Sequence, residues 1–303
     1  MTRSPQIRFL AGSERLHLQD GPIDLIVEAH GNEANVRAAY ATAARRFTGL
    51  LDELCSELPL LRKAADPRRC LLQGVIARRM HAAVAPFAGQ HFITPMAAVA
   101  GSVAEEILGA MLQAAPLARA YVNNGGDIAL HLESGEHFSV GLMDRPDRHG
   151  LMRTTMIEAF DPTRGVATSG RHGRSFSLGI TDAVTVLART ASQADAAATI
   201  IANAVDLPGH PGIVRAPAHD LQPDSDLGAR LVTRDVGDLS DGEIEEALEA
   251  GAISARKWLA EGLIDGAALR LHGETVVVAA RGIEMFRPET AARQLAAEGA
   301  VHV

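Results

Sequence analysis

Two short stretches decide what this chain is expected to fold into: Gly165-Val-Ala-Thr-Ser-Gly170 and, further along, Asp195-Ala-Ala-Ala-Thr199. The first reads as a small-residue turn that leaves backbone carbonyls and hydroxyls accessible. The second lies in an alanine-rich run that favours a helix, where positions four apart share one face. Asp195 and Thr199 would therefore point two hard oxygens at one spot. A carbonyl of the turn would add a third, and such oxygens are the donors of a Mg²⁺ site.

The elements expected around these stretches mix strands and helices without a regular strand–helix–strand alternation, which predicts the α+β class. Strands are expected at 6–10, 14–19, 23–29, 119–123, 126–132, 136–143, 153–159, 182–188, 230–234 and 267–280. Helices are expected at 33–61, 70–86 with a proline interruption, 95–113, 193–205 and 241–260. Ser134-Gly135 reads as a hairpin turn between two of the strands. The segment 208–226 is rich in Pro, Gly and Asp and reads as a long loop, which would subdivide an otherwise single domain over 1–303.

Composition excludes some classes of function. The apolar fraction of 47% and the charged fraction of 22% are those of an ordinary globular protein. A net charge of −8, with arginines spread along the chain, argues against a nucleic-acid partner. No hydrophobic signal region and no run of about 20 apolar residues is present, so we expect no membrane span and a cytoplasmic location.

Cysteines and paired arginines add little chemistry. Cys55 and Cys70 lack the spacing of a metal site or a disulfide framework, and we expect buried free thiols. Arg45-Arg46, Arg68-Arg69 and Arg78-Arg79 are expected on solvated helix faces, with a phosphate contact as the alternative.

Two further motifs carry possible chemistry. In Tyr121-Val-Asn-Asn-Gly-Gly-Asp-Ile128, two glycines after a strand would let a backbone approach a ligand, or would simply make a tight turn. The glycine-punctuated segment 160–174 would cradle a phosphate with help from Arg171, His172 and Arg174, or would be a surface loop whose basic residues balance the acidic surface.

Taken together and in this order, the motifs resemble the FAD:protein FMN transferase superfamily, the ApbE-like proteins. Asn-Gly-Gly-Asp-Ile at 124–128 is followed by a strand at 138–144, by Ala-Thr-Ser-Gly at 167–170, by Ala-Val-Thr-Val-Leu-Ala at 183–188 and by Ala-Asp-Ala-Ala-Ala-Thr at 194–199. The resemblance covers 120–206 well. The remainder is closer to an uncharacterised branch of that superfamily, usually labelled as ApbE-like proteins of unknown function.

The resemblance implies a fold and a site. The fold is α+β, related to the T-fold, with antiparallel sheets and helices packed on them. Mg²⁺ would be held by Asp195, Thr199 and the carbonyl of Ala167, with Asp195 and Thr199 as the catalytic pair. An FAD or FMN nucleotide would be the cofactor or substrate, with FMN transferred from FAD to a threonine of a target protein. The residues implied beside the nucleotide are Asn124, Gly125, Gly126, Asp127, Thr168, Ser169 and Gly170.

Some family elements are missing. The His-His-x-x-Asp-Pro-x-Thr-Gly-like segment that the transferases carry has no counterpart between Arg171 and Asp182, and the Met-Gly-Thr element expected near the N-terminus is also missing. Two alternatives therefore stand beside flavin chemistry. One is an enzyme with another substrate, using 96–104 as a pocket wall and Glu105, Glu106 or His172 as acid–base groups. The other is a non-enzymatic module that binds a small molecule or a partner. The alanine-rich helices would also allow a homodimer.

Overall fold

The computed structural model describes residues 4–145, 148–280, 287–288 and 301–302, with side chains for 4–141 and 155–280. The strands are β1 (Gln6–Phe9), β2 (Leu16–Asp20), β3 (Ile23–His30), β4 (Arg119–Asn124), β5 (Asp127–Leu132), β6 (His137–Arg145), β7 (Arg148–Glu158), β8 (Gly165–Ser169), β9 (Ala183–Ala188), β10 (Ile213–Pro217), β11 (Leu231–Val236), β12 (Gly266–Leu271), β13 (Glu274–Ala279), β14 (Arg287–Pro288) and β15 (Val301–His302). The helices are α1 (Glu33–Phe47), α2 (Leu50–Ser56), α3 (Leu58–Leu61), α4 (Val75–Ala88), the 3₁₀ helix η1 (Pro95–Ala98), α5 (Val99–Ala114), α6 (Ala191–Ala204), α7 (Ala218–Leu221) and α8 (Asp241–Ala260).

The centre of the fold is a nine-stranded antiparallel sheet in the order β1-β2-β3-β4-β5-β8-β9-β12-β13. Strands β6, β7, β14 and β15 form a separate four-stranded sheet, and β10 pairs with β11 alone. This arrangement confirms the α+β class.

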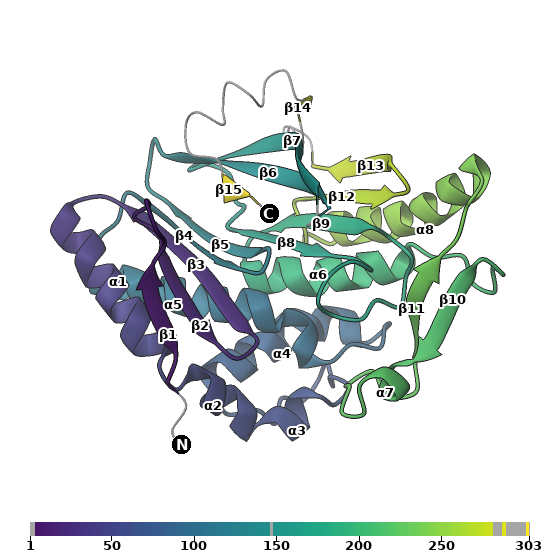
Figure 1. Cartoon of the computed structure of the whole chain (residues 1–303), viewed down its shortest axis with the longest axis horizontal. Coiled ribbons are helices and arrows are strands. Elements are labelled where there is room, and N and C mark those ends of the chain that lie inside the picture. Colours follow the sequence, from purple (N-terminus) through teal and green to yellow (C-terminus); the bar gives the residue numbers. More distant parts are fainter. Residues whose placement is uncertain (1–3, 146–147, 281–286, 289–300, 303) are drawn as a thin grey trace.

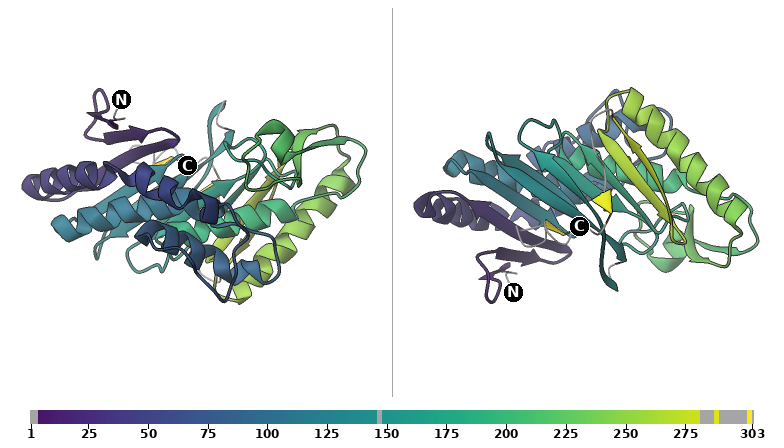
Figure 2. Two further views of the ribbon diagram at one scale, coloured as in Figure 1. Left: turned by 90° about the horizontal axis from the view of Figure 1, so that it is seen from below. Right: turned by 90° about the horizontal axis from the view of Figure 1, so that it is seen from above.

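The large sheet lies between helices and the small sheet, so the molecule has three layers (Figure 1). Helices α5 and α6 cover one face, with α1 and α8 beside them and α4 further out (Figure 2). The main apolar cluster fills that side and includes Val122 and Ala129 of the sheet. The alternate strand residues, such as Tyr121 and Ile128, point to the other face and pack on Phe138 of β6. The period of two along a strand thus separates two apolar cores.

The helix predictions need two corrections. The expected helix at 33–61 is three helices, because Gly49 adopts a left-handed conformation with φ 82° and Pro59 starts a new short helix. The second helix begins at Val75 rather than at 70, and Pro86 lies inside it. Pro86 is tolerated because it falls in the last turn, where only one backbone hydrogen bond is lost.

Three further predictions of local structure are wrong. The expected hairpin around Ser134-Gly135 does not form, because β5 belongs to the large sheet and β6 to the small one. The stretch 165–169 is not a turn but strand β8, paired on both sides. The expected loop 208–226 contains β10 and α7. In these cases, strand pairing outside the local segment decides the structure.

The cysteine prediction is also wrong: Cys55 and Cys70 are both exposed. One helical stretch, Pro95–Ala114, is long and apolar enough to cross a membrane by length and composition alone. Half of its most apolar window is buried inside the protein, where it packs on α1, α6 and the large sheet as a core helix does.

Candidate functional site

The β4–β5 turn forms one side of the candidate site. Gly125 and Gly126 have φ values of 65° and 110°, so a two-residue hairpin closes between Asn124 and Asp127, which pair across it. The Asn123 side chain accepts a hydrogen bond from the Gly126 N–H at 2.8 Å and holds the turn. Asn124 and Asp127 are buried, and the alternation of the strands points both toward the helix layer.

Helix α6 brings Asp195 to the same place. The Thr190 side chain caps the helix by accepting from the Gln193 N–H. Asp195 Oδ2 accepts a hydrogen bond from the Gly101 N–H of α5 at 3.0 Å, and the Asn124 side-chain amide donates to the Ala100 carbonyl at 3.2 Å. The first turn of α5 thus connects the β4–β5 turn with α6.

Asp127 and Asp195 form a pair of like charges in a buried setting. Burial and the charge of Asp195 raise the pKa of Asp127 well above its usual value, against a hydrogen bond from the Thr168 N–H at 3.2 Å. Burial raises the pKa of Asp195 to about 7, although the backbone N–H groups of Gly101 and Ala100 act in the opposite direction. Two carboxylates held this way are stabilised by a nearby positive charge.

Strand β8 decides which backbone carbonyl faces this pair. Ala167 is fully buried and lies opposite Val186 of β9. In an antiparallel strand the N–H and C=O of one residue point to the same side, and neighbouring residues alternate. Because the Thr168 N–H points to Asp127, the Thr168 carbonyl faces the carboxylates and the Ala167 carbonyl faces β9. Thr168 therefore offers a backbone oxygen on the side of the pair, and the metal role of the Ala167 carbonyl stays a prediction.

The remaining predicted residues surround the same point. Thr199 lies one turn after Asp195 on the half-buried face of α6, and its hydroxyl makes no hydrogen bond within the described part of the chain. Ser169 follows Thr168 at the end of β8, and Gly170 starts the next loop. A Cβ on Gly170 would lie 2.3 Å from the Asp182 carbonyl oxygen, so only glycine fits there.

The donor set can be tested against a metal. In the described ranges, no group of three or more His, Cys, Asp or Glu side chains is arranged to hold an ion. A site at the carboxylate pair would therefore need hydroxyl or carbonyl oxygens and water as well. Such mixed oxygen sites with retained water suit Mg²⁺, whereas Zn²⁺ prefers nitrogen and sulfur. The residues present fit Mg²⁺.

The loop 170–182 crosses the end of the sheet beside the pair. Arg171 donates to Asp182 Oδ1 from Nε at 3.0 Å and from Nη2 at 2.7 Å, and His172 Nε2 lies 3.3 Å from the same oxygen. Asp182 Oδ2 also accepts from the His272 N–H at 2.7 Å. Asp182 thus anchors the loop, a role for which the sequence has no signal. His172, expected as an acid–base candidate, is engaged in this anchor.

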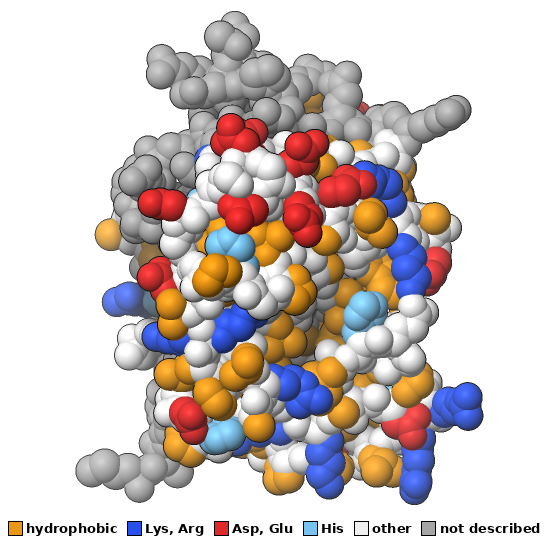
Figure 3. Space-filling model, turned by 90° about the vertical axis from the view of Figure 1, so that its right-hand side faces the viewer, with side chains coloured by type: hydrophobic (Ala, Val, Ile, Leu, Met, Phe, Trp, Pro, Cys, Tyr) orange, Lys and Arg blue, Asp and Glu red, His pale blue; other side chains and the backbone are white. Residues whose placement is uncertain are grey.

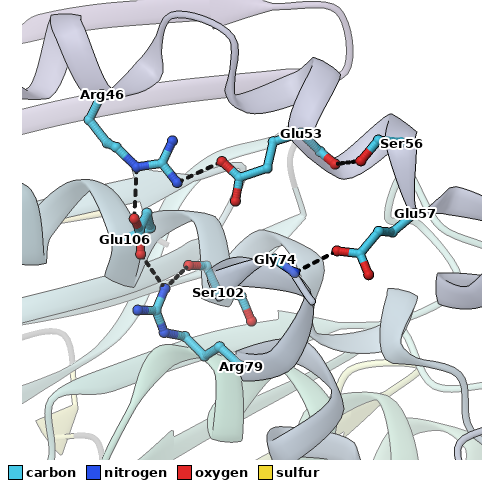
Figure 4. A network of polar contacts seen from close by, with 8 residues as sticks. All are labelled: Arg46, Glu53, Ser56, Glu57, Gly74, Arg79, Ser102 and Glu106. Carbon is cyan, nitrogen blue, oxygen red and sulfur yellow. Dashed lines mark hydrogen bonds and ion pairs between the residues drawn. The ribbon is translucent and has the colours of Figure 1, made fainter. Parts of the chain in front are cut away.

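Glu105 and Glu106 on α5 are also committed to structural contacts. Glu105 Oε1 accepts from the Ser192 N–H at 2.6 Å and so caps α6, and Glu105 Oε2 pairs with Arg79 Nε at 3.3 Å. Glu106 bridges Arg46 and Arg79 at 2.7 and 3.0 Å (Figure 4). The prediction that Arg46 and Arg79 lie on solvated faces is therefore wrong. The sequence does not predict the cap by Glu105, because Glu105 and Ser192 are 87 positions apart.

A hollow of about 760 Å³ lies between α8 and β13, away from the Asp127–Asp195 pair. Its acidic lining residues are Asp241, Glu245, Glu246, Glu249 and Glu274. Carboxylates gather toward the top of this face of the molecule (Figure 3). These carboxylates would repel a phosphate-bearing ligand in the hollow unless a cation accompanied it.

The chain is similar in sequence to known proteins. A family model described as AbpE bacteria matches residues 7–277. The UPF0280 protein MK0206 of Methanopyrus kandleri is 37% identical over 183 residues, which are 59% of this chain and 69% of that protein. Further archaeal UPF0280 proteins are matched over only 51–55% of their length.

Two solved structures align along most of the chain at 12% identity. They are the ApbE protein of Thermotoga maritima, with a TM-score of 0.47 over 96% of this chain and 99% of that one, and the flavinyl transferase ApbE of Pseudomonas stutzeri, with 0.41 over 92% and 95%. The family assignment rests instead on the model match and the Methanopyrus relative. On these two findings the chain belongs to the AbpE bacteria family, which confirms the ApbE-like resemblance of its motifs.

Proposed function

We propose that this protein binds a flavin nucleotide together with Mg²⁺ at the Asp127–Asp195 pair, and that it transfers FMN from FAD. The observation that carries the proposal is the pair itself. Two carboxylates from separate elements converge in a buried setting that raises the pKa of both, and Thr199 lies one helical turn after Asp195 on α6. A divalent cation would offset the cost of charging the pair.

The oxygens available to the cation come from three elements. Asp195 Oδ2 accepts from the Gly101 N–H, and the carboxylate has further lone pairs for a metal. Thr199 and Asp127 supply oxygens from α6 and β5, and the Thr168 carbonyl supplies one from β8. When bound, Mg²⁺ would neutralise the charge that develops on phosphate oxygens during phosphoryl transfer.

The surrounding residues would position the nucleotide. Gly125 and Gly126 carry no side chains, so the turn lets phosphate groups approach its backbone. Asn124, Ser169 and Gly170 border the same space and offer amide, hydroxyl and backbone donors. In the transfer, a threonine oxygen of the target protein would form the new bond to the FMN phosphorus, AMP would leave with the bridging oxygen of the pyrophosphate, and the threonine hydroxyl proton would pass to solvent.

One observation favours a second function, binding without transfer. The interval 171–182, where the transferases carry their His-Asp-Pro segment, is here occupied by the contacts of Arg171 and His172 with Asp182. These side chains are therefore held in the anchor of the loop. Flavin binding and FMN transfer need to be measured separately.

The test is calorimetry with FAD and FMN, each with and without Mg²⁺, together with chromatographic detection of AMP released from FAD. We expect wild type to bind FAD only weakly without Mg²⁺, and Asp195→Asn to lose at least about tenfold in the Mg²⁺-dependent affinity. The exposed Asp52 of α2 provides a matched control, Asp52→Asn, which should behave as wild type. Binding without AMP release supports the second function, and no flavin affinity in any condition rejects both.

A further inference from the structure

Arg174 differs from the other cations of its loop. Arg171 and His172 are held by Asp182, which anchors the base of the loop. The side chain of Arg174 is exposed and reaches across the sheet end, where Nη1 donates to the Pro22 carbonyl at 3.0 Å. No carboxylate ion pair is formed by Arg174 among the described residues. Its guanidinium therefore keeps donors for another partner.

The guanidinium lies directly over the β4–β5 turn. A Cβ added to Gly125 would come within 2.3 Å of Arg174 Nη2, so the arginine occupies the space that a side chain at 125 would take. The positive charge of Arg174 acts on Asp127 and opposes the effects of burial and of Asp195, which raise the pKa of that carboxyl. Arg174 is thus a positive charge that acts on the turn side of the pair.

Resting on the proposed function above, we propose that Arg174 alternates between two anions: it is the counter-charge of the Asp127–Asp195 pair without a divalent cation, and it binds the phosphate oxygens of the ligand once the cation is in place. A divalent cation on the same carboxylates repels the guanidinium, since both are positive. A phosphate that joins the cation attracts it, and the planar fork of arginine matches phosphate oxygens. The ligand class is therefore an anion with phosphate oxygens next to the metal.

The other arginines near the site are not available for this role. Arg79 is held by Glu105 and Glu106, and Arg171 by Asp182. Arg174 combines exposure, a single backbone hydrogen bond and a place beside the pair. Because the loop is anchored at Asp182, Arg174 can change its partner by rotation of its side chain alone.

The two contacts predict opposite effects of one substitution. In calorimetry at low salt, Arg174→Ala should bind Mg²⁺ alone more tightly, by about five- to tenfold, because a repulsive charge is removed. With saturating Mg²⁺ the same variant should bind FAD more weakly, by about tenfold, because a charged phosphate contact is lost. Gly125→Ala, whose methyl group displaces the guanidinium, should reproduce the gain in Mg²⁺ affinity.

The control is Arg256→Ala, which removes the same charge from an exposed pair with Glu249 on α8 and should change neither affinity. If Arg174→Ala leaves both affinities unchanged, or moves both in one direction, the role of Arg174 is overturned. Asp195→Asn separates this outcome from a failure of the proposed function. Unchanged Mg²⁺ binding in Asp195→Asn overturns the metal site, and the role of Arg174 with it.

Discussion

Asp195 has two roles: it accepts a hydrogen bond from helix α5, and it belongs to the proposed metal site. Oδ2 accepts from the Gly101 N–H at the start of α5, where the helix presents unpaired donors and a partial positive charge. This contact alone would explain an aspartate at the position. The hydrogen bond to Gly101 does not explain why Asp195 lies half-buried beside Asp127, because two like charges make the pair costly to ionise. The proposed metal would use the lone pairs of the carboxylate that its hydrogen bonds leave available.

The raised pKa of Asp195 predicts how stability depends on pH. The folded-state pKa, about 7, lies above the value near 4 of an unfolded chain. The folded protein therefore holds the proton more tightly, and the free energy of unfolding should fall as pH rises from about 4 to about 7. Urea unfolding in EDTA at pH 5 and pH 8 should show this loss in wild type and a smaller loss in Asp195→Asn. Equal losses in both proteins would contradict the assignment, and added Mg²⁺ should restore stability at pH 8.

Helices α5 and α6 each cap the N-terminus of the other. Asp195 of α6 accepts from α5, and Glu105 of α5 accepts from the Ser192 N–H of α6. The helices approach closely because Gly101 faces the backbone of Ala191, where a Cβ would lie 2.3 Å from the carbonyl oxygen. A small residue and two reciprocal caps therefore set the crossing of the helices. The position of Asp195 in the site depends on that crossing.

Alanine at two glycines of α5 tests this close approach. Gly101→Ala should destabilise the protein by at least about 2 kcal/mol, because its methyl group meets fixed backbone atoms. Gly109→Ala, on the same helix with no atom within 4 Å of its added Cβ, should stabilise it by about 0.5 kcal/mol through better helix propensity. The urea midpoints of the two variants give the comparison. Similar midpoints would show that the two helices can separate at little cost.

At the scale of the whole molecule, a chain of charges connects the outer helices to the site. Arg46 of α1 donates to Glu106 of α5 and to Glu53 of α2 (Figure 4). Arg79 of α4 pairs with both Glu106 and Glu105. Burial alone would raise the pKa of Glu106, but the two arginines outweigh it and hold that pKa below its usual value. Through Glu105, the outer helices thus support the cap of α6.

Glu106→Gln should destabilise the protein by about 2 kcal/mol at pH 7, since it leaves two half-buried guanidinium groups without their shared carboxylate. The control Glu33→Gln breaks an exposed pair with Arg37 on α1 and should cost under about 0.5 kcal/mol. Because the folded-state pKa of Glu106 is lowered, its contribution should be lost as pH falls below about 4. Thermal unfolding of both variants at pH 7 and pH 3.5 tests this, and an equal effect at both pH values would contradict it.

Local signals in the sequence were enough for much of the fold. The capping box of Ser240 and Glu243 marks the start of α8, the period of apolar residues marks α1 and α5, and the glycines at 125–126 mark the β4–β5 turn. These features depend on neighbours within a few residues, so a single chain segment determines them. The order of the motifs along the chain also indicated the family.

Tertiary structure decided how these pieces meet. Strand β8 resembles a turn in the sequence because Gly165 and Ala167 lack strand propensity and Gly170 follows it, whereas its pairing with β5 and β9 makes it extended. The same sheet and the helices packed on it bring Asp127 and Asp195, which are 68 positions apart (195 − 127), to the same buried region. By itself, the sequence determined which oxygens the protein carries, while long-range pairing and helix packing decided which of them face one another.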